Sequence, residues 1–224
     1  MIVAGVDGCR AGWVMVARDL GSGALTLSVA PRFAGLPDRA TVVAIDMPIG
    51  LSDEGPRGCD SLARRLLPGR ASSVFPPPAR PMLAMTTYPQ ANAWGKARGR
   101  GLSKQAWNIL AHIRDLDDTL TPVDQDRVFE AHPELAFVRL NGGLPPPPKK
   151  TAEGVARRLR LLRRAGLKRL ARLLAERPPG VKADDVLDAA ALTLTAERIR
   201  LGQGIRLIGT PERDATGRRM EIWY

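Results

Sequence analysis

Three apolar segments of this chain end in an acidic residue, and this pattern constrains the fold more than any other feature. Residues 2–7 end at Asp7, the run 42–45 is followed by Asp46, and the segment 127–131 carries Glu130 near its end. A carboxylate at the end of a buried strand costs free energy unless a cation compensates it. If these strands are neighbours, their acids can converge. The pattern therefore predicts a sheet with a cluster of acids at the ends of its strands.

Short turns separate the first strands of the chain. The segment Asp7–Gly12 and the run Gly21–Gly23 are turn-like, and apolar side chains alternate after the second turn, as in a half-buried strand. Three strands in an antiparallel meander are expected here: 2–7, 13–18 and 24–30. The run 42–45 is apolar at every position, which is typical of a strand covered on both faces. We therefore expect an α/β fold in which a mixed sheet, the meander plus parallel strands, is flanked by helices.

Helical spacing of apolar residues predicts the helices that flank this sheet. Ser103 suits the N-cap of one of them. The expected helices are 58–67, 104–120, two basic helices on either side of Gly166, and 184–201. A single helical turn within 32–40 and a closing hairpin of 205–208 with 219–223 complete the prediction.

Two segments interrupt the alternation of strands and helices. Residues 51–101 are rich in Gly and Pro, and Pro145–Pro148 forms a polyproline stretch before the basic helices. We expect a single domain over residues 1–224, with a loop-rich insertion at 51–101 and a basic helical insertion at 145–178.

The positive charge of the chain is concentrated in one segment. Its 34 Lys and Arg residues exceed its 23 Asp and Glu residues, which gives a formal net charge of +11. Residues 149–177 contain eleven of the basic residues and two acidic ones, a net of +9. Such a surface favours a polyanionic partner such as nucleic acid. A solvated helix face is an equally good interpretation.

Composition excludes several other classes of protein. The two cysteines, Cys9 and Cys59, form no C-x-x-C pair and are too few for a disulfide scaffold or a cysteine-rich zinc site. No apolar run approaches the ~20 residues that span a bilayer, and the N-terminus does not resemble a signal peptide. We expect a cytoplasmic protein that has no membrane partner.

A second group of acids opens the last expected helix. Asp184 fits an N-cap and Asp185 fits the helix dipole. Asp188 lies one turn further in and shares a face with Asp185. Hard divalent cations prefer oxygen ligands, so converging carboxylates suit Mg²⁺ or Mn²⁺. Two such ions can hydrolyse a phosphodiester bond. Each acid also has a structural interpretation: Asp7 as a turn former, Asp46 as a loop cap, and Asp188 as an exposed helix residue.

The order of these acids resembles the RNase H-like superfamily, in which the first strand, the fourth strand and the last helix each supply a metal-binding carboxylate. Several segments are similar to a domain-of-unknown-function family of predicted RNase H-like nucleases, the DUF429 type. The matching segments cover nearly the whole chain in order: 6–13, 45–51, Cys59-Asp60 with Arg64, 72–75, 103–105, 130–134, Lys149-Lys150 and 185–189.

The resemblance implies Asp7, Asp46 and Asp188 as ligands of Mg²⁺ or Mn²⁺. It makes Asp185 the next candidate catalytic acid, and Glu130 completes the expected site. One departure concerns the helix after the third strand, which often supplies an acid in RNase H enzymes. The corresponding segment 32–40 offers only Asp38.

Basic residues near the matching segments are candidates for substrate binding. Arg offers a bidentate phosphate geometry that Lys lacks, and a Lys near a helix N-terminus can contact a phosphate. His132 suits a proton shuttle or a phosphate contact, although a structural histidine is the commoner case. The candidates are Arg64, Arg80, Lys104, His132, Lys149 and Lys150, with Arg70 beside them.

Three functions are compatible with this pattern. The first is a metal-dependent nuclease that hydrolyses phosphodiester bonds of nucleic acid. The second is a catalytically silent nucleic-acid-binding module of the same fold. The third is a small-molecule phosphoesterase whose cleft is narrowed by the insertion at 51–101. An ATPase or sugar kinase of the actin-like type is disfavoured, because those proteins use two such domains and this chain has no internal repeat.

Overall fold

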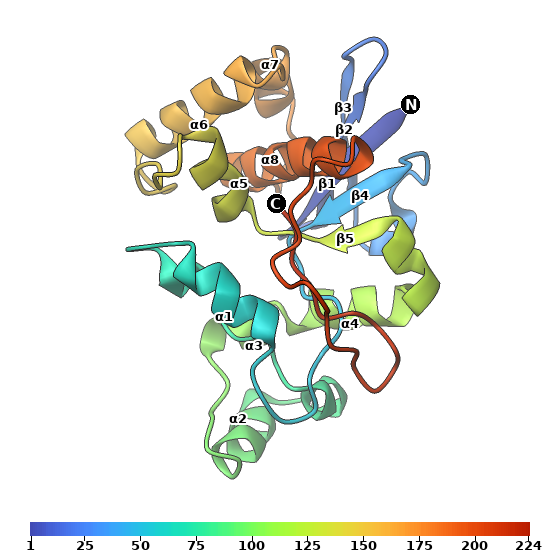
Figure 1. Cartoon of the computed structure of the whole chain (residues 1–224), viewed down its shortest axis with the longest axis vertical. Helices are drawn as coiled ribbons and strands as arrows, with labels where there is room; N and C mark the ends of the chain where they lie inside the picture. Colours follow the sequence, from blue (N-terminus) through green and yellow to red (C-terminus); the bar gives the residue numbers. More distant parts are fainter.

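The sheet at the centre of this protein has five strands, in the order β3-β2-β1-β4-β5. A computed structural model describes residues 1–224 (Figure 1). The strands are β1 (Ile2–Cys9), β2 (Gly12–Asp19), β3 (Leu25–Ala30), β4 (Val42–Ile45) and β5 (Val128–Glu130). The α-helices are α1 (Gly58–Arg65), α2 (Tyr88–Lys96), α3 (Lys104–Asn108), α4 (Leu110–Thr119), α5 (Pro133–Leu140), α6 (Ala152–Arg164), α7 (Leu170–Ala175) and α8 (Ala183–Arg200). Short 3-10 turns are η1 (Phe33–Gly35), η2 (Ala71–Ser73), η3 (Arg80–Ala84) and η4 (Pro122–Asp126).

The mixed sheet predicted from the sequence is confirmed. Strands β1, β2 and β3 pair antiparallel, and β4 pairs parallel with both β1 and β5. Helices lie on both sides of the sheet, as expected for an α/β fold (Figure 1). No helix is both long enough and apolar enough to cross a membrane.

Alternation along the strands decides which face each side chain covers. In β1, Val3 packs with Leu192 of α8, whereas Ala4 and Val6 pack with Ile113 of α4. Since strand side chains alternate between faces, the odd-numbered residues of β1 face α8 and the even-numbered residues face α4. Asp7 therefore points to the side of α8.

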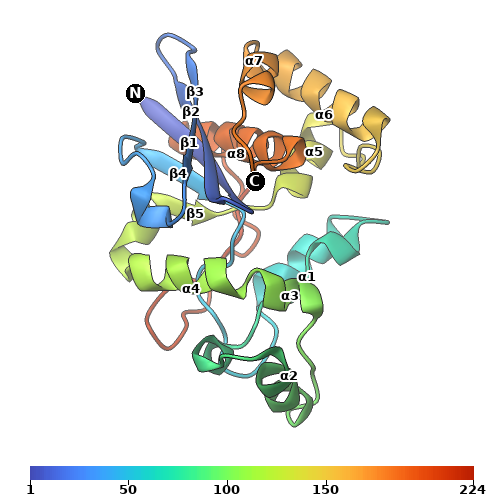
Figure 2. The ribbon, with the colours of Figure 1, turned by 180° about the vertical axis from the view of Figure 1, so that it is seen from behind.

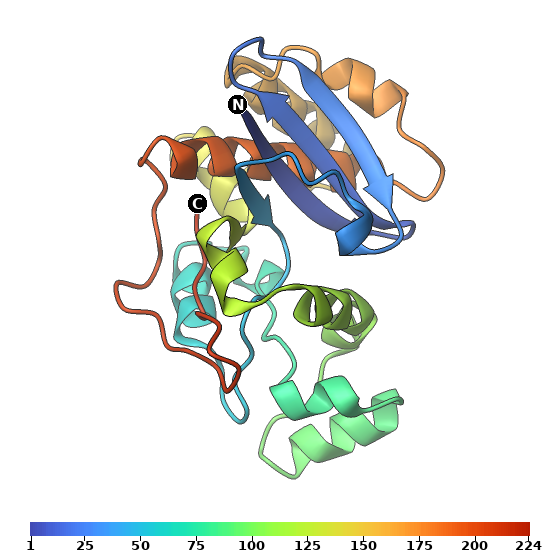
Figure 3. The ribbon, with the colours of Figure 1, turned by 90° about the vertical axis from the view of Figure 1, so that its right-hand side faces the viewer.

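Helix α8 lies very close to β1 because Gly5 has no side chain. A Cβ atom on Gly5 would stand 2.0 Å from the carbonyl oxygen of Ala189 and 2.3 Å from the amide nitrogen of Thr193. The Thr193 hydroxyl also donates a 2.7 Å hydrogen bond to the carbonyl of Val16 in β2. These contacts fix the height and rotation of α8 over the sheet. In Figure 3 the helix runs behind the strands.

The segment between β4 and β5 is more helical than expected. Helices α1 to α4 gather below the sheet (Figures 2 and 3), and α2 lies in the segment expected to be irregular. The expected helix 104–120 is divided at Ile109, where the backbone turns to φ −95° and ψ 0°. This turn lets Ala106 pack in a small separate core with Met82 and Ala91, while Ile113 packs under the sheet.

The C-terminal segment returns to the sheet without forming regular strands. Ile205 and Tyr224 exchange two backbone hydrogen bonds, and Trp223 bridges both Arg206 and Ala131. The expected closing hairpin is therefore present as irregular pairing. It extends the sheet beyond β5 at one edge.

Candidate functional site

Three of the expected acids lie together near the ends of β1 and β4. Strand β1 continues to Cys9, so Asp7 lies within it and not at its end as expected. The parallel register pairs Val6 with Ile45, so Asp7 and Asp46 follow at adjacent positions. The amide of Asp46 also donates to the carbonyl of Val6 at 3.0 Å. Asp188 lies one turn into α8, directly before the Ala189 carbonyl that contacts Gly5. The close approach of α8 thus brings Asp188 over the ends of the two strands.

The ionisation of these carboxyls shows that they share one environment. Burial raises the pKa of Asp7 well above its ordinary value, and the charges of Asp46 and Asp188 raise it further. Burial likewise raises the pKa of Asp46 and brings that of Asp188 to about 7. The ammonium of Lys149 lowers all three. The positive charge of Lys149 therefore does not offset the burial and mutual repulsion of the three carboxyls.

Lys149 is the cation that partly compensates these acids. Its Nζ lies 2.7 Å from Oδ2 of Asp188, while the other oxygen, Oδ1, is buried without a hydrogen-bond partner. No three His, Cys, Asp or Glu side chains lie close enough together to hold a metal ion as they stand. The donor set nevertheless fits a hard divalent cation, because every donor is a carboxylate oxygen and one of them is unpaired.

His132 and Glu134 border the site on the side of Asp46. The His132 ring lowers the pKa of Asp46, whereas Glu134 raises it. Nε2 of His132 lies 3.3 Å from the carbonyl of Ser73, so this nitrogen donates, and Nδ1 is buried without a partner. Glu134 contacts Arg158 through one oxygen at 2.7 Å and leaves the other unpaired. Sequence analysis matched Glu134 to the family but assigned it no role.

Glu130 does not join this group. The register of β5 pairs Glu130 with Ile45 rather than with Asp46. Since Ile45 faces α4, Glu130 points to the face opposite Asp46. There it accepts two hydrogen bonds from Arg57, at 2.6 and 2.7 Å, and Asp60 contacts the same guanidinium. Arg57 and Asp60 form a buried charge cluster that sequence analysis did not identify.

The remaining candidates occupy the surface or are paired elsewhere. Asp185 accepts the backbone N–H of Lys182 at 2.8 Å, so it caps α8, yet its charge still raises the pKa of Asp7. Lys150 is exposed, and the Lys104 ammonium lies 3.6 Å from the centre of the Tyr88 ring. Asp38, the acid offered by segment 32–40, pairs with Arg127.

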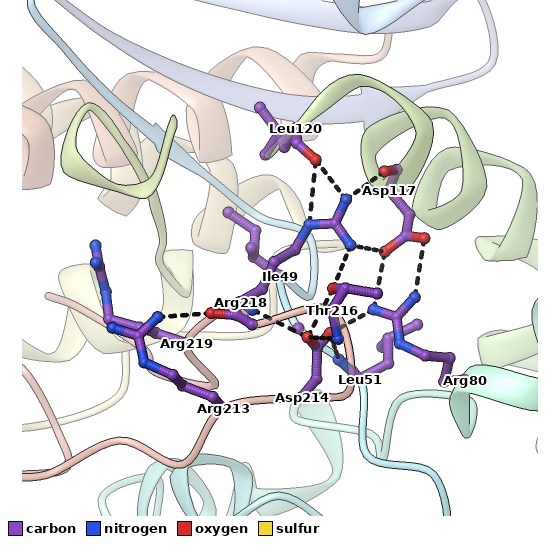
Figure 4. A network of polar contacts seen from close by, with 12 residues as sticks. Ile49, Leu51, Arg80, Asp117, Leu120, Arg213, Asp214, Thr216, Arg218 and Arg219 are labelled. Atoms are coloured by element: carbon purple, nitrogen blue, oxygen red, sulfur yellow. Dashed lines mark hydrogen bonds and ion pairs between the residues drawn. The ribbon is translucent and has the colours of Figure 1, made fainter. Parts of the chain in front are cut away.

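The arginines of the loop-rich segment are mostly used within the fold. Arg64 donates to the carbonyl of Val74, and Arg70 donates to that of Pro146. Arg80 binds Asp117 and Asp214, in a network that Arg218 extends (Figure 4). Arg80 is therefore a structural residue that anchors the C-terminal segment to α4.

The raised carboxyl pKa values predict a dependence of stability on pH. In the unfolded chain Asp188 ionises near 3.8, whereas in the folded protein it keeps its proton up to about 7. Stability is therefore highest below the lower value and is lost as pH rises towards the upper one. Without added metal, we expect the free energy of unfolding to fall by about 2–3 kcal/mol between pH 5 and pH 8.

Urea unfolding in a chelating buffer measures this slope. Asp188→Asn removes one titrating group and should flatten the slope, while Asp53→Asn, an exposed acid without a partner, should leave it unchanged. A wild-type stability that rises from pH 5 to pH 8 contradicts the prediction.

Comparison with known proteins identifies one family. Residues 5–213 match the family model described as "Protein of unknown function (DUF429)". No curated protein and no solved structure matches the chain.

Proposed function

Because this chain belongs to the DUF429 family, whose function is unknown, we propose its function from the chemistry of the site. The protein is a metal-dependent hydrolase of phosphodiester bonds in nucleic acid. Asp7, Asp46 and Asp188 are the ligands of Mg²⁺ or Mn²⁺. The observation that carries this proposal is that three carboxyls from β1, β4 and α8 share one under-compensated site.

The site suits hydrolysis at phosphorus. When bound, a divalent ion activates water and offsets negative charge on the phosphate. Asp7 and Asp46 are only partly buried, so a substrate can reach their oxygens. Nδ1 of His132 is an unpaired acceptor beside Asp46 and can take a proton from the attacking water.

Exposed cations on α6 and α7 supply the surface for a polyanionic chain. Buried Leu161, Leu162 and Leu170 turn one face of these helices to the core, so most of their basic residues face solvent. The exposed ones are Arg160, Arg163 and Arg164 of α6 and Arg172 of α7, and Lys168 and Arg169 between the helices are exposed as well. Binding through such residues weakens steeply with salt, because counterions are released from the nucleic acid.

We extend the proposal to the fold superfamily, which we take to be RNase H-like. An antiparallel meander followed by parallel strands, with an acid-bearing last helix across them, supports an RNase H-like domain. On this proposal, residues 51–101 and 145–178 are insertions into that domain. Both lie between Asp46 and Asp188 in sequence, and the second supplies Lys149.

The decisive experiment is hydrolysis of a substrate series with and without Mg²⁺ or Mn²⁺. Labelled dinucleotides, single strands and duplexes of DNA and RNA are compared, with the wild type against Asp7→Asn. We expect metal-dependent cleavage that falls at least about a thousandfold in Asp7→Asn, because the neutral amide is a poor metal ligand.

The matched control is Asp53→Asn, which changes an exposed acid outside the site and should retain full activity. Cleavage that is equal in Asp7→Asn and in the wild type would overturn the proposal. Cleavage of dinucleotides alone would identify a small-molecule phosphoesterase instead.

One observation favours a second candidate, a nucleic-acid-binding module without catalysis. Lys149 already pairs with Asp188, and the acids do not stand in a metal-binding arrangement. On this alternative, Asp7→Asn leaves affinity for nucleic acid unchanged or improves it, and no metal-dependent product forms.

A further inference from the structure

A short rigid loop carries Lys149 into the carboxylate site. The carbonyl of Pro148 accepts hydrogen bonds from both the amide and the hydroxyl of Thr151, at 3.0 and 2.8 Å. A Cβ atom on Gly154 would stand 2.0 Å from the same carbonyl, so the loop packs directly on the first turn of α6. The position of Lys149 is thus set by the backbone and not by a flexible surface loop.

A buried arginine fixes the loop from below. Arg158 is 1% exposed and donates to the carbonyl of Pro147 at 2.6 Å and to Glu134 at 2.7 Å. Glu134 belongs to α5, which follows β5 directly. The loop is therefore tied to the end of the sheet through a largely buried ion pair.

Formal charges define what the site can still accept. Once deprotonated, as metal ligands must be, Asp7, Asp46 and Asp188 carry three negative charges. Lys149 supplies one positive charge, with its Nζ 2.7 Å from Oδ2 of Asp188. A net charge of −2 remains, and a single divalent cation would neutralise it. A second divalent ion would leave an excess of positive charge beside a fixed ammonium.

The neighbouring acids have partners of their own, although Glu134 and Asp185 still raise the pKa values of Asp46 and Asp7. Glu134 is neutralised by Arg158. Asp185 caps the positive end of α8 through the Lys182 amide. The His132 ring donates to the carbonyl of Ser73 through Nε2 and leaves Nδ1 without a partner.

We propose that Lys149 is a built-in second cation of this site, so that the protein binds one divalent ion where a two-metal nuclease binds two. The inference rests on the proposed function, since it takes the three acids to be metal ligands. In this proposal the Lys149 ammonium occupies the position of the second ion, next to the unpaired Oδ1 of Asp188.

Calorimetric titration with Mn²⁺ tests the inference without any substrate. We expect the wild type to bind one equivalent. Lys149→Met should bind two, the first about tenfold more tightly or better, because a repelling charge has been removed. Lys149→Arg keeps the charge and should bind one. Lys150→Met, the adjacent exposed lysine, should behave as the wild type.

Each other outcome overturns the inference. If the wild type binds two equivalents of Mn²⁺, Lys149 does not occupy the position of the second ion. A single equivalent in Lys149→Met, at any affinity, would show that no second place exists. If Lys149→Met binds Mn²⁺ and the wild type does not, the lysine prevents metal binding and does not act as a second cation.

Failure of the proposed function gives a different result. In that case neither the wild type nor Lys149→Met binds Mn²⁺, and Asp7→Asn behaves like both. Thermal unfolding of every variant checks the fold; because the Lys149 side chain is 40% exposed, its replacement should not unfold the protein.

Discussion

Arg57→Met is expected to lower the free energy of unfolding by about 3–5 kcal/mol, because it leaves charged partners buried without compensation. The Arg57 guanidinium is 1% exposed and contacts Asp60 and Glu130, each at 2.6 Å from Nη2. It also donates to the carbonyls of Ile49 and Gly50, at 3.2 and 3.1 Å. Burial already raises the pKa of Glu130 to about 7 with the arginine present.

The matched control for this substitution is Arg172→Met. Arg172 pairs with Glu176 at 2.7 Å, but both side chains are exposed, at 73% and 54%. Exposed pairs contribute little, so a loss below about 0.5 kcal/mol is expected there. Urea unfolding at pH 7 compares the two. Equal losses in both variants would show that the buried cluster adds nothing to stability.

Much of the fold follows from local sequence pattern. The turns after β1 and β2 and the alternation in β3 determine the meander, because they act over a few residues. The apolar run of β4 places it inside the sheet for the same reason. The division of the helix at Ile109 has no such local signal, since no Gly or Pro occurs there. The division arises because α3 and α4 pack into two separate hydrophobic cores.

The site was predictable where it depended on strand ends and not where it depended on register. Asp46 directly follows β4, and Asp7 lies near the end of the adjacent parallel strand β1, so the sequence brings them together once the strand order is assumed. Glu130 ends a strand too, but a shift of one residue moves a side chain to the other face of a sheet. The register of β5 is set by tertiary packing, which a single sequence does not display.

Buried charge pairs were the least predictable part. Arg57, Arg80 and Arg158 are three of many arginines, and nothing in the neighbouring sequence separates them from the exposed ones on α6 and α7. Their partners come from distant segments: Glu130 for Arg57, Asp214 for Arg80 and Glu134 for Arg158. Such pairs become visible only when the fold brings the segments together.

Gly5→Ala is the second substitution with a large expected effect. Its Cβ would meet the backbone of α8 at 2.0 Å, and backbone atoms cannot rotate away as a side chain can. Overpacking usually costs about 1–3 kcal/mol, and a clash with a helix backbone should reach the upper end of this range or exceed it. Helix α8 must retreat from β1, and Asp188 must retreat with it. We therefore expect both a lower free energy of unfolding and weaker Mn²⁺ binding.

Gly8→Ala separates this effect from the loss of a glycine as such. Gly8 lies in the same strand but faces α4, where a Cβ would meet only side-chain atoms, His112 Cδ2 at 3.3 Å and Met47 Cε at 3.5 Å. The free energy of unfolding of Gly8→Ala should stay within about 1 kcal/mol of that of the wild type. Denaturant unfolding and Mn²⁺ titration are measured on both variants. If Gly5→Ala binds Mn²⁺ as the wild type does while losing stability, the packing of α8 on Gly5 does not position Asp188 for the metal. If it loses neither, the close approach of α8 to β1 is itself refuted.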